Sequence, residues 1–225
     1  MFIQPLTEGN YFHIYNRGVN SEDIFKEEKN YSFFLQQYKK YCSPVVDTLA
    51  YALLKNHFHL LVYVKENVTV PGNAGKGIIR LNASIQLSHF FNSYAQAMNK
   101  TYKRTGPLFE DPFERKVIED DNYVTAMIFY CHYNALLHGM VDDFQRWPHS
   151  SYHSIIKNDN AIANTDHVLS WFGGKDAFES QHRDRYNDGG LHLDIFYPEQ
   201  PPTGLKAAVG VSEPATARHE SYNRL

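Results

Sequence analysis

Two β-rich runs of this chain are separated by only two residues, and this spacing limits the folds that the chain can adopt. The runs span residues 45–54 and 57–64, and Lys55-Asn56 lies between them. A two-residue connection that contains Asn suits a tight β-hairpin turn. We therefore expect the two strands to be antiparallel neighbours in one sheet.

Further strands and helices are predicted on both sides of this hairpin. Aromatic and β-branched runs predict strands, and apolar residues at helical spacing predict helices. The order β-α-β-β-α-β-α indicates an α+β fold, in which helices pack on an antiparallel β-sheet. The predicted strands cover 9–17 and 113–119, the predicted helices cover 28–42, 77–102, 123–138 and 143–156, and a polar loop covers 68–76.

The last third of the chain differs in composition from the rest. Residues 166–172 and 176–186 read as two short helices joined by Gly173-Gly174. Prolines and small residues dominate after Tyr197, a composition typical of a mobile terminus. We therefore divide the chain into a main domain at 1–157, a helical extension at 158–195 and a tail at 196–225 that we expect to be mobile.

The charges are distributed unevenly along the chain. The formal net charge of −3 is not that of a protein that binds nucleic acid through bulk positive charge. Residues 1–157 carry 16 Lys+Arg against 15 Asp+Glu, a net of +1, and residues 158–225 carry 6 against 10, a net of −4. The acidic excess lies outside the main domain, so a role in nucleic-acid binding stays open for that domain.

The cysteines and the apolar runs bear on the compartment. Cys42 and Cys131 are the two cysteines of the chain, too few for a disulfide framework. The longest apolar runs are far too short to span a bilayer, and the N-terminal residues lack the pattern of a secretory signal. We expect a cytoplasmic protein without a membrane partner.

The second strand of the hairpin carries two histidines on one face. Alternate residues of a strand share a face, so His57 and His59 point the same way, while Phe58 and Leu60 form an apolar opposite face. Two neutral imidazoles can hold one divalent cation. Since 12 histidines in 225 residues give roughly 0.6 His-x-His pairs by chance, the tripeptide alone more often marks half-buried structural histidines.

The predicted helix at 123–138 offers a second group of candidates. Tyr130 and Asn134 are four residues apart and share a helix face. If this face meets the histidines, the Asn134 amide oxygen can join them on a metal and the Tyr130 phenol lies beside it. Taken alone, a Tyr and an Asn on an amphipathic helix more often serve packing and a hydrogen bond.

Together these residues suit one kind of chemistry. A metal held by two imidazoles and one amide oxygen keeps positions open for a phosphate. A phenol is a poor nucleophile at neutral pH, but a cation on the phosphate makes phosphorus more electrophilic and stabilises the added negative charge. Attack by tyrosine gives a phosphotyrosine that conserves the energy of the phosphodiester, which suits moving a DNA strand.

Six segments, in order, resemble the single-tyrosine HUH transposases, in particular their REP-associated tyrosine transposase branch. The resemblance covers about residues 8–157, and the two short helices that follow are similar to an extension in that branch. It implies a ferredoxin-like or RRM-like HUH fold and makes 1–157 the catalytic domain. The segments are His13-Ile14-Tyr15-Asn16-Arg17-Gly18, Lys55-Asn56-His57-Phe58-His59-Leu60-Leu61-Val62, Arg104-Thr105-Gly106-Pro107-Leu108-Phe109, Phe113-Glu114-Arg115-Lys116, Tyr130-Cys131-His132-Tyr133-Asn134 and Trp147-Pro148-His149-Ser150-Ser151-Tyr152.

The resemblance assigns a role to each candidate. His57 and His59 correspond to the HUH pair and Asn134 to the third ligand of Mg²⁺ or Mn²⁺, and Tyr130 falls at the place of the nucleophile. The chain departs from the family at Ala135, where proline is usual, and this change bears on local geometry more than on chemistry. Tyr133 is a rival nucleophile on another helix face, and Tyr123 is a second reserve on the same face as Tyr130.

The resemblance also implies a partner, single-stranded DNA with hairpin structure. Basic side chains can contact its phosphates, although a solvated mixed-charge surface explains any single one of them equally well. Insertion-sequence members of the family act as dimers and REP-associated members can act as monomers, so a homodimer stays open. The candidate DNA-binding residues are Arg17, Lys100, Lys103, Arg104, Arg115 and Lys116.

Two other functions compete with a transposase. A host can retain the fold as a binding module for repetitive DNA hairpins, and such a module does not need a metal site. An RRM-like RNA binder would instead expose sheet aromatics, for which Tyr11, His13 and Tyr15 alternate suitably.

Overall fold

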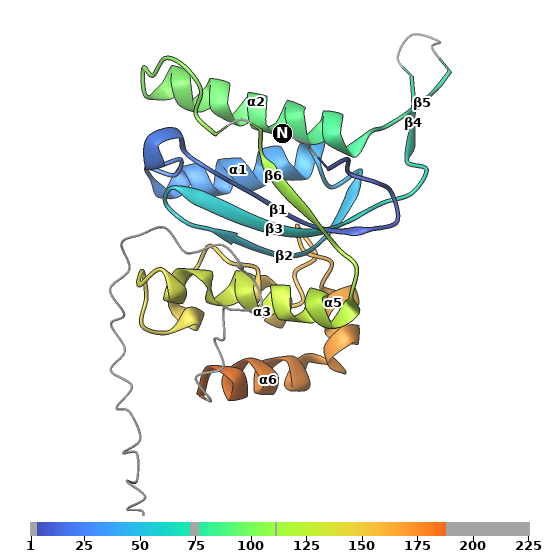
Figure 1. The fold of residues 1–225 in the computed structure, drawn as a ribbon, viewed down its shortest axis with the longest axis vertical. Coiled ribbons are helices and arrows are strands. Elements are labelled where there is room, and N and C mark those ends of the chain that lie inside the picture. The colour runs from blue at the N-terminus through green and yellow to red at the C-terminus, as the bar shows by residue number, and fades with distance from the viewer. Residues whose placement is uncertain (1–3, 73–76, 111, 188–225) are drawn as a thin grey trace, which may run out of the picture. The chain divides into compact units, whose positions relative to one another are not determined.

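Helices cover both faces of a four-stranded antiparallel sheet in this protein (Figure 1). The computed structural model describes residues 4–72, 77–110 and 112–187. The elements are β1 (Tyr11–Arg17), η1 (Val19–Ser21), α1 (Glu28–Tyr41), β2 (Val46–Leu53), β3 (His57–Val64), β4 (Thr69–Pro71), β5 (Ile78–Arg80), α2 (Ala83–Thr101), β6 (Glu114–Ile118), α3 (Asp121–Leu137), η3 (Phe144–Arg146), α4 (Tyr152–Ile156), α5 (Thr165–Phe172) and α6 (Lys175–Asn187).

The sheet has the strand order β2-β3-β1-β6, and every neighbouring pair is antiparallel. Its β2–β3 pair is the predicted hairpin, closed by a hydrogen bond from the Leu54 N–H to the His57 carbonyl at 2.8 Å. The pairing register slips by one residue after Thr48, which marks a β-bulge in β2. The predicted α+β fold class with an antiparallel sheet is therefore confirmed.

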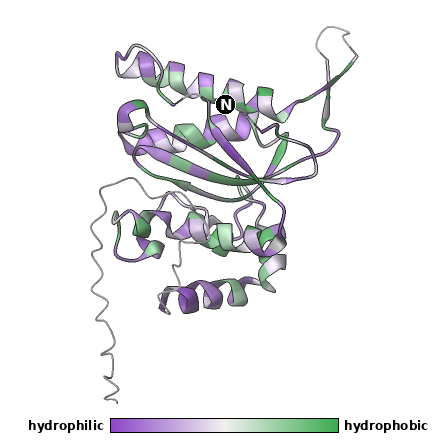
Figure 2. Cartoon of the chain, in the orientation of Figure 1, coloured by the Kyte–Doolittle hydropathy of each residue, from purple (hydrophilic) through white to green (hydrophobic). Residues whose placement is uncertain are grey.

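The two faces of the sheet follow the alternation of side chains along each strand. Phe12 and Ile14 of β1 lie on one face with Phe58 and Leu60 of β3, all fully buried in a core with α1 and α2. The opposite face carries the odd-numbered residues of both strands and lies against α3 (Figure 1). Figure 2 shows the contrast in hydropathy between the apolar stretches of the strands and the largely hydrophilic α6.

The start of the second long helix differs from the sequence prediction. Residues 77–82 are not helical, because Ile78 and Ile79 belong to β5, which pairs with β4. The Asn82 side chain accepts a hydrogen bond from the Ile85 N–H at 3.1 Å and caps α2. The predicted loop at 68–76 was wrong where Thr69–Pro71 forms β4. Strand pairing between β-branched residues determines the local structure here, although the sequence has a helical periodicity.

The other helices lie close to their predicted positions. The helix predicted at 123–138 is α3, which starts two residues earlier because the Asp120 side chain caps it. The single short helix predicted at 143–156 is divided into η3 and α4. Both short helices of the extension are present as α5 and α6. The tail predicted at 196–225 lies outside the described residues.

The α5–α6 pair packs on the α3 side of the sheet, apart from the core that the sheet forms with α1 and α2. The buried Phe178 of α6 contacts Phe172 of α5, with ring centroids 4.9 Å apart, and it lies 5.8 Å from the His132 ring of α3.

Within residues 4–72, 77–110 and 112–187, no helix is long and apolar enough to cross a membrane.

Candidate active site

Strand β3 places two histidines on the face that α3 covers. The rings of His57 and His59 lie with their centroids 5.3 Å apart and their planes nearly perpendicular. His59 is only 3% exposed, and His57 is half-buried at the start of the strand. The predicted common face of the two side chains is thus present in the fold.

Helix α3 brings the predicted tyrosine and asparagine to these histidines. The Tyr130 ring stands edge-on to His59, with the ring centroids 5.2 Å apart. One turn further along, the Asn134 Oδ1 atom lies 3.3 Å from Nε2 of His57. The four residues that sequence spacing singled out therefore meet in one place, between the sheet and α3.

The turn before β3 fixes the orientation of the first histidine. His57 Nδ1 lies 2.7 Å from the Asn56 side-chain oxygen, to which it donates. Asn56 is held in turn by the Gly18 N–H, which donates to its carbonyl at 2.8 Å. A Cβ at Gly18 would lie 2.1 Å from the Glu22 carbonyl oxygen, so this close approach requires glycine.

Sequence reasoning missed a third histidine of the site, His13 on β1. Its Nε2 lies 2.9 Å from Nδ1 of His59, and its ring is 6.0 Å from the Tyr130 ring. The available signal was its alternation with Tyr11 and Tyr15, which the sequence analysis weighed as a surface for stacking RNA bases. The partner on β3 lies 46 residues away, so no local pattern could reveal this contact.

A fourth histidine, His138, caps the end of α3 beside the site. Its ring centroid is 4.7 Å from that of His57. The sequence analysis also missed this residue, although Tyr130, Asn134 and His138 follow each other at a spacing of four and so share one helix face. The site thus collects more imidazoles than the two that the motif contains.

Burial keeps these imidazoles neutral. It lowers the pKa of His57 to about 4, with further lowering from the nearby His138, and it lowers the pKa of His13 to about 3. Burial likewise holds the pKa of His59 well below its ordinary value. A neutral imidazole has one nitrogen lone pair available as an acceptor or metal ligand.

The donor set fits a divalent cation. Because Nδ1 of His57 donates to Asn56, its Nε2 carries a lone pair that faces the lone pairs of Asn134 Oδ1. A cation held by both atoms would make this contact favourable, and their 3.3 Å separation is short enough for both to bind one ion. Without a cation, turning the amide would let Asn134 Nδ2 donate to Nε2 instead.

Two further observations bear on that fit. Asn134 is fully buried and its Nδ2 has no hydrogen-bond partner among the described residues. When His59 donates from Nδ1 to His13, its Nε2 keeps the lone pair that a metal requires. In the described part of the chain, no three His, Cys, Asp or Glu side chains group to hold a metal. The set therefore depends on the amide oxygen of Asn134.

The rival tyrosines occupy other positions. Tyr133 is buried on the far side of α3, where its hydroxyl donates to the His182 carbonyl, and burial raises the pKa of its phenol. Tyr123 lies at the start of α3, where its ring is 5.8 Å from Nζ of Lys116. Tyr123 and Lys116 line an open pocket of about 470 Å³ beside the outer edge of β6.

The sheet face does not offer the open aromatic platform of an RRM-like RNA binder. His13 is 6% exposed beneath α3. Tyr11 packs edge-on against Trp171 of α5, with the ring centroids 5.5 Å apart. The helices that cover this face therefore disfavour the RNA-binding alternative.

Two of the six predicted DNA-binding residues flank the histidines. Arg17 pairs with His57 across β1 and β3, and its Nε forms an ion pair with Glu110 at 2.8 Å. Lys116 is exposed on β6 and pairs with His13 of β1. These two cations lie on the same face of the sheet as Tyr130.

The remaining four basic residues lie elsewhere. Lys100, Lys103 and Arg104 lie at the end of α2, in the helix layer on the opposite face of the sheet (Figure 1). Arg104 is held by Glu22 at 2.5 Å, and its side chain is only 12% exposed. Arg115 points to the α2 face, where its guanidinium lies 3.9 Å from the centre of the Phe113 ring. The structure does not bring these four side chains to the histidines.

Comparisons with known proteins agree with the predicted resemblance. No family model matches the chain. The chain is 29% identical over 128 residues to a protein of Haemophilus influenzae named as a candidate REP-associated tyrosine transposase, and the match covers 55% of this chain and 69% of that protein. Its fold matches a solved REP-associated tyrosine transposase bound to a REP hairpin, with a TM-score of 0.55 and 14% identity, over 70% of this chain and 85% of that one. The resemblance and the fold are confirmed.

Proposed function

We propose that this chain is a metal-dependent transposase that cleaves and rejoins single-stranded DNA through a 5′-phosphotyrosine intermediate. The observation that carries the proposal is the meeting of Tyr130 and Asn134 of α3 with His57 and His59 of β3. It combines a tyrosine hydroxyl with three donors suited to one cation. The resemblance to REP-associated tyrosine transposases supports this assignment.

Each of the four residues that the sequence predicted has a role in the proposed reaction. The Tyr130 oxygen attacks phosphorus, gives up its proton and forms the new P–O bond, while the bond to the 3′ oxygen breaks and that oxygen leaves as a 3′-hydroxyl. His57, His59 and Asn134 would hold Mg²⁺ or Mn²⁺, which neutralises charge on the phosphate when bound. A second 3′-hydroxyl then reverses the step and releases Tyr130.

The proposed substrate is DNA with hairpin structure. The solved neighbour is bound to a REP hairpin, and Arg17 and Lys116 of this chain flank the site on the Tyr130 face. A hairpin stem with a single-stranded flank presents phosphates to both cations. Local contacts of this kind do not require a basic protein, in agreement with the net charge of −3.

The reaction is tested on labelled single-stranded hairpins taken from DNA that flanks the gene, with Mn²⁺ or EDTA. We expect a covalent protein–DNA band with Mn²⁺ that disappears with EDTA and in Tyr130→Phe. Tyr133→Phe is the matched control, since it removes a hydroxyl from the same helix away from the site. Cleavage by Tyr130→Phe at the wild-type rate would refute the nucleophile, and tight binding without a covalent product would favour the binding module.

The DNA path is tested with matched lysines on the two faces of the sheet. We expect Lys116→Ala to weaken hairpin binding and to lower the salt dependence of log K by about 0.7 for one lost single-strand phosphate contact. Lys100→Ala removes another exposed cation, from the α2 layer, and should change neither quantity. Equal effects of both variants would contradict a path along the α3 face.

A further inference from the structure

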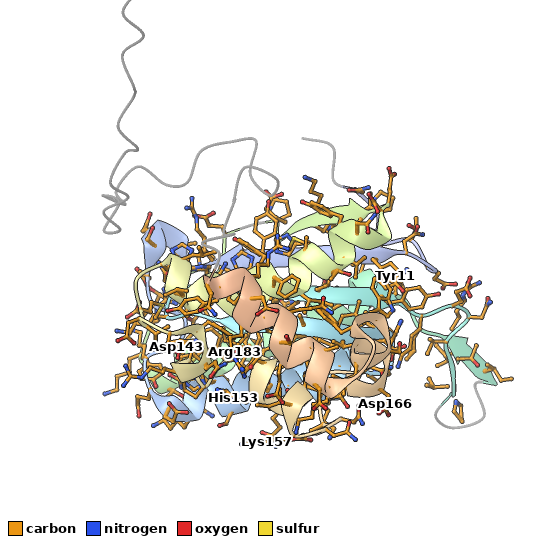
Figure 3. All side chains as sticks on the ribbon, turned by 90° about the horizontal axis from the view of Figure 1, so that it is seen from below. Tyr11, Asp143, His153, Lys157, Asp166 and Arg183 are labelled. Carbon is orange, nitrogen blue, oxygen red and sulfur yellow. The ribbon has the colours of Figure 1, made fainter. Side chains whose placement is uncertain are left out.

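The side of α3 that faces away from the sheet carries a buried chain of polar side chains. His132 Nδ1 lies 2.8 Å from Nε2 of His182 on α6, and His132 Nε2 lies 2.8 Å from the Ser151 hydroxyl. All three side chains are fully buried. Figure 3 is viewed from the side of α6, which lies over α3 in that view. This hydrogen-bonded chain therefore ties α3 to α6.

The direction of every hydrogen bond among His182, His132 and Ser151 can be assigned. His182 Nδ1 must donate to the Phe178 carbonyl at 2.7 Å, so its Nε2 accepts from His132 Nδ1. His132 Nε2 then accepts from the Ser151 hydroxyl, whose oxygen accepts from the Tyr51 N–H of β2 at 2.9 Å. Burial, which lowers the pKa of His182 to about 3, keeps its imidazole neutral as this assignment requires.

The hydrogen-bonded chain contacts α3 on the side opposite to the catalytic residues. At about 100° per residue, His132 projects roughly 180° away from the direction midway between Tyr130 and Asn134. The Tyr130 hydroxyl lies roughly 9 Å from the helix axis, given a Cα radius of about 2.3 Å and the length of the side chain. A rotation of about 6° would thus displace it by about 1 Å, enough to cost about 100-fold in rate.

Apolar packing alone specifies this rotation poorly. The residues of α3 are apolar on nearly all sides, as its sequence DNYVTAMIFYCHYNALL shows, and it is buried both against the sheet and against η3. A helix that is apolar all round lacks a polar stripe to distinguish one rotation from another. Buried polar groups that must all be paired can select one arrangement among several compact ones.

We propose that His182, His132 and Ser151 are positioning residues that fix the rotation of α3 and thereby place Tyr130 and Asn134. This inference rests on the proposed function of Tyr130, and it makes α6 a working part of the strand-transfer machinery. It also gives a role to two segments, Tyr130–Asn134 and Trp147–Tyr152, beyond the nucleophile and the metal ligand that the first contains.

The test replaces both imidazoles at once. In His132→Leu/His182→Leu no donor or acceptor of the pair is left alone, and the Ser151 hydroxyl can turn to the Tyr51 carbonyl 3.4 Å away, so the melting temperature should stay near that of the wild type or rise. We expect covalent adduct formation to fall about 100-fold, with hairpin affinity changed less than threefold. His182→Gln keeps an acceptor for His132 Nδ1 and should retain the rate within about fivefold.

A second variant separates positioning from stability. Val168→Ala removes buried volume from α5 without touching the chain, so it should lower the melting temperature and leave the rate unchanged below that temperature. A purely structural role of the chain predicts instead that rate follows stability in all variants. If the double variant is folded and reacts at the wild-type rate, the proposal is wrong. If the double variant does not fold, Ser151→Ala takes its place, and an unchanged rate there refutes the proposal.

A measurement without DNA distinguishes this proposal from the proposed function. The Tyr130 and His59 rings, 5.2 Å apart, should give nuclear Overhauser contacts in the wild type and in His182→Gln. We expect these contacts to weaken or multiply in His132→Leu/His182→Leu. If the wild type forms no covalent product, the proposed function fails while this measurement still decides the positioning. Unchanged ring contacts in the double variant would refute the positioning alone.

Discussion

Two buried histidine pairs lie on the two sides of α3, and they differ in how completely their hydrogen bonds are satisfied. On the side of α6, His132 and His182 are 2.8 Å apart and continue to Ser151 with every donor and acceptor assigned. On the side of the sheet, His13 and His59 are 2.9 Å apart beside His57. There, two lone pairs face each other and an amide nitrogen has no partner among the described residues.

The difference teaches how the same residue type serves two purposes in one fold. Buried polar groups are normally paired, and a group that is not paired calls for an explanation such as an ion or a catalytic role. Both pairs are desolvated and neutral, so burial alone does not tell them apart. Completeness of pairing does, and it agrees with the positioning role proposed for the α6 side and with the metal binding proposed for the sheet side.

The largest expected effect comes from replacing Asn134 by Leu, a side chain of similar shape. We expect strand transfer to fall about 10³-fold, about 4 kcal/mol of transition-state stabilisation, because the cation loses a ligand. The free energy of unfolding should rise by about 1 kcal/mol, because the unpaired Nδ2 and the opposed lone pairs disappear. Adduct formation and urea unfolding measure the two quantities.

The matched control for that variant lies on the other side of the helix. Ser151→Ala leaves His132 Nε2 and the Tyr51 N–H without partners and should lower the free energy of unfolding. Changes of opposite sign in the free energy of unfolding of Asn134→Leu and Ser151→Ala would support the difference between the two sides of α3. A clear loss of stability in Asn134→Leu would mean that the amide is a satisfied structural group.

The second prediction concerns the metal itself. A ligand that binds only the folded state at 100 times its Kd stabilises it by about 2.7 kcal/mol. We expect Mn²⁺ to raise the free energy of unfolding of the wild type by about this amount relative to EDTA. The increment should vanish in Asn134→Leu and persist in His182→Gln, which leaves the sheet side intact. An equal increment in both variants would place the metal elsewhere.

Sequence alone could predict the part of the site that depends on short spacings. His57 and His59 share a strand face and Tyr130 and Asn134 share a helix face, and both statements follow from backbone periodicity. That the two faces meet required the fold. His13 and His182 could not be assigned, because their partners are 46 and 50 residues away in the chain.

The fold shows the same division between local and distant information. The β2–β3 hairpin follows from its two-residue connection. Helix α2 follows from the helical spacing of its apolar residues. The helix predicted at residues 77–82 was wrong because the backbone of Ile78 and Ile79 pairs with β4. A helical pattern in the sequence does not reveal such a partner. Tertiary pairing overrides local preference at such positions.

The third prediction uses pH to address the α6 side. The pKa of His182 is lowered from 6.5 to about 3 by burial, so the unfolded chain binds its proton first as the pH falls. The contribution of His182 to the free energy of unfolding is therefore fully present above pH 6.5 and decreases as the pH falls toward 3. Between pH 7 and pH 5 this contribution should fall by about 2 kcal/mol. His182→Gln does not titrate, so urea unfolding at the two pH values should show a smaller loss by about that amount. Equal losses in both proteins would indicate that His182 titrates normally.

The smallest effect should come from Tyr133→Phe, and its value lies in the comparison with Tyr130→Phe. The Tyr133 hydroxyl donates to the buried His182 carbonyl, so its removal should cost about 1 kcal/mol of unfolding free energy. The two tyrosines lie three residues apart on one helix, yet we expect Tyr133→Phe to form the covalent adduct at the wild-type rate. Tyr130→Phe should instead lose the adduct. An adduct that depends on Tyr133 would exchange the roles of the two sides of α3, because the nucleophile would then lie beside His182, whose ring is already hydrogen-bonded to His132.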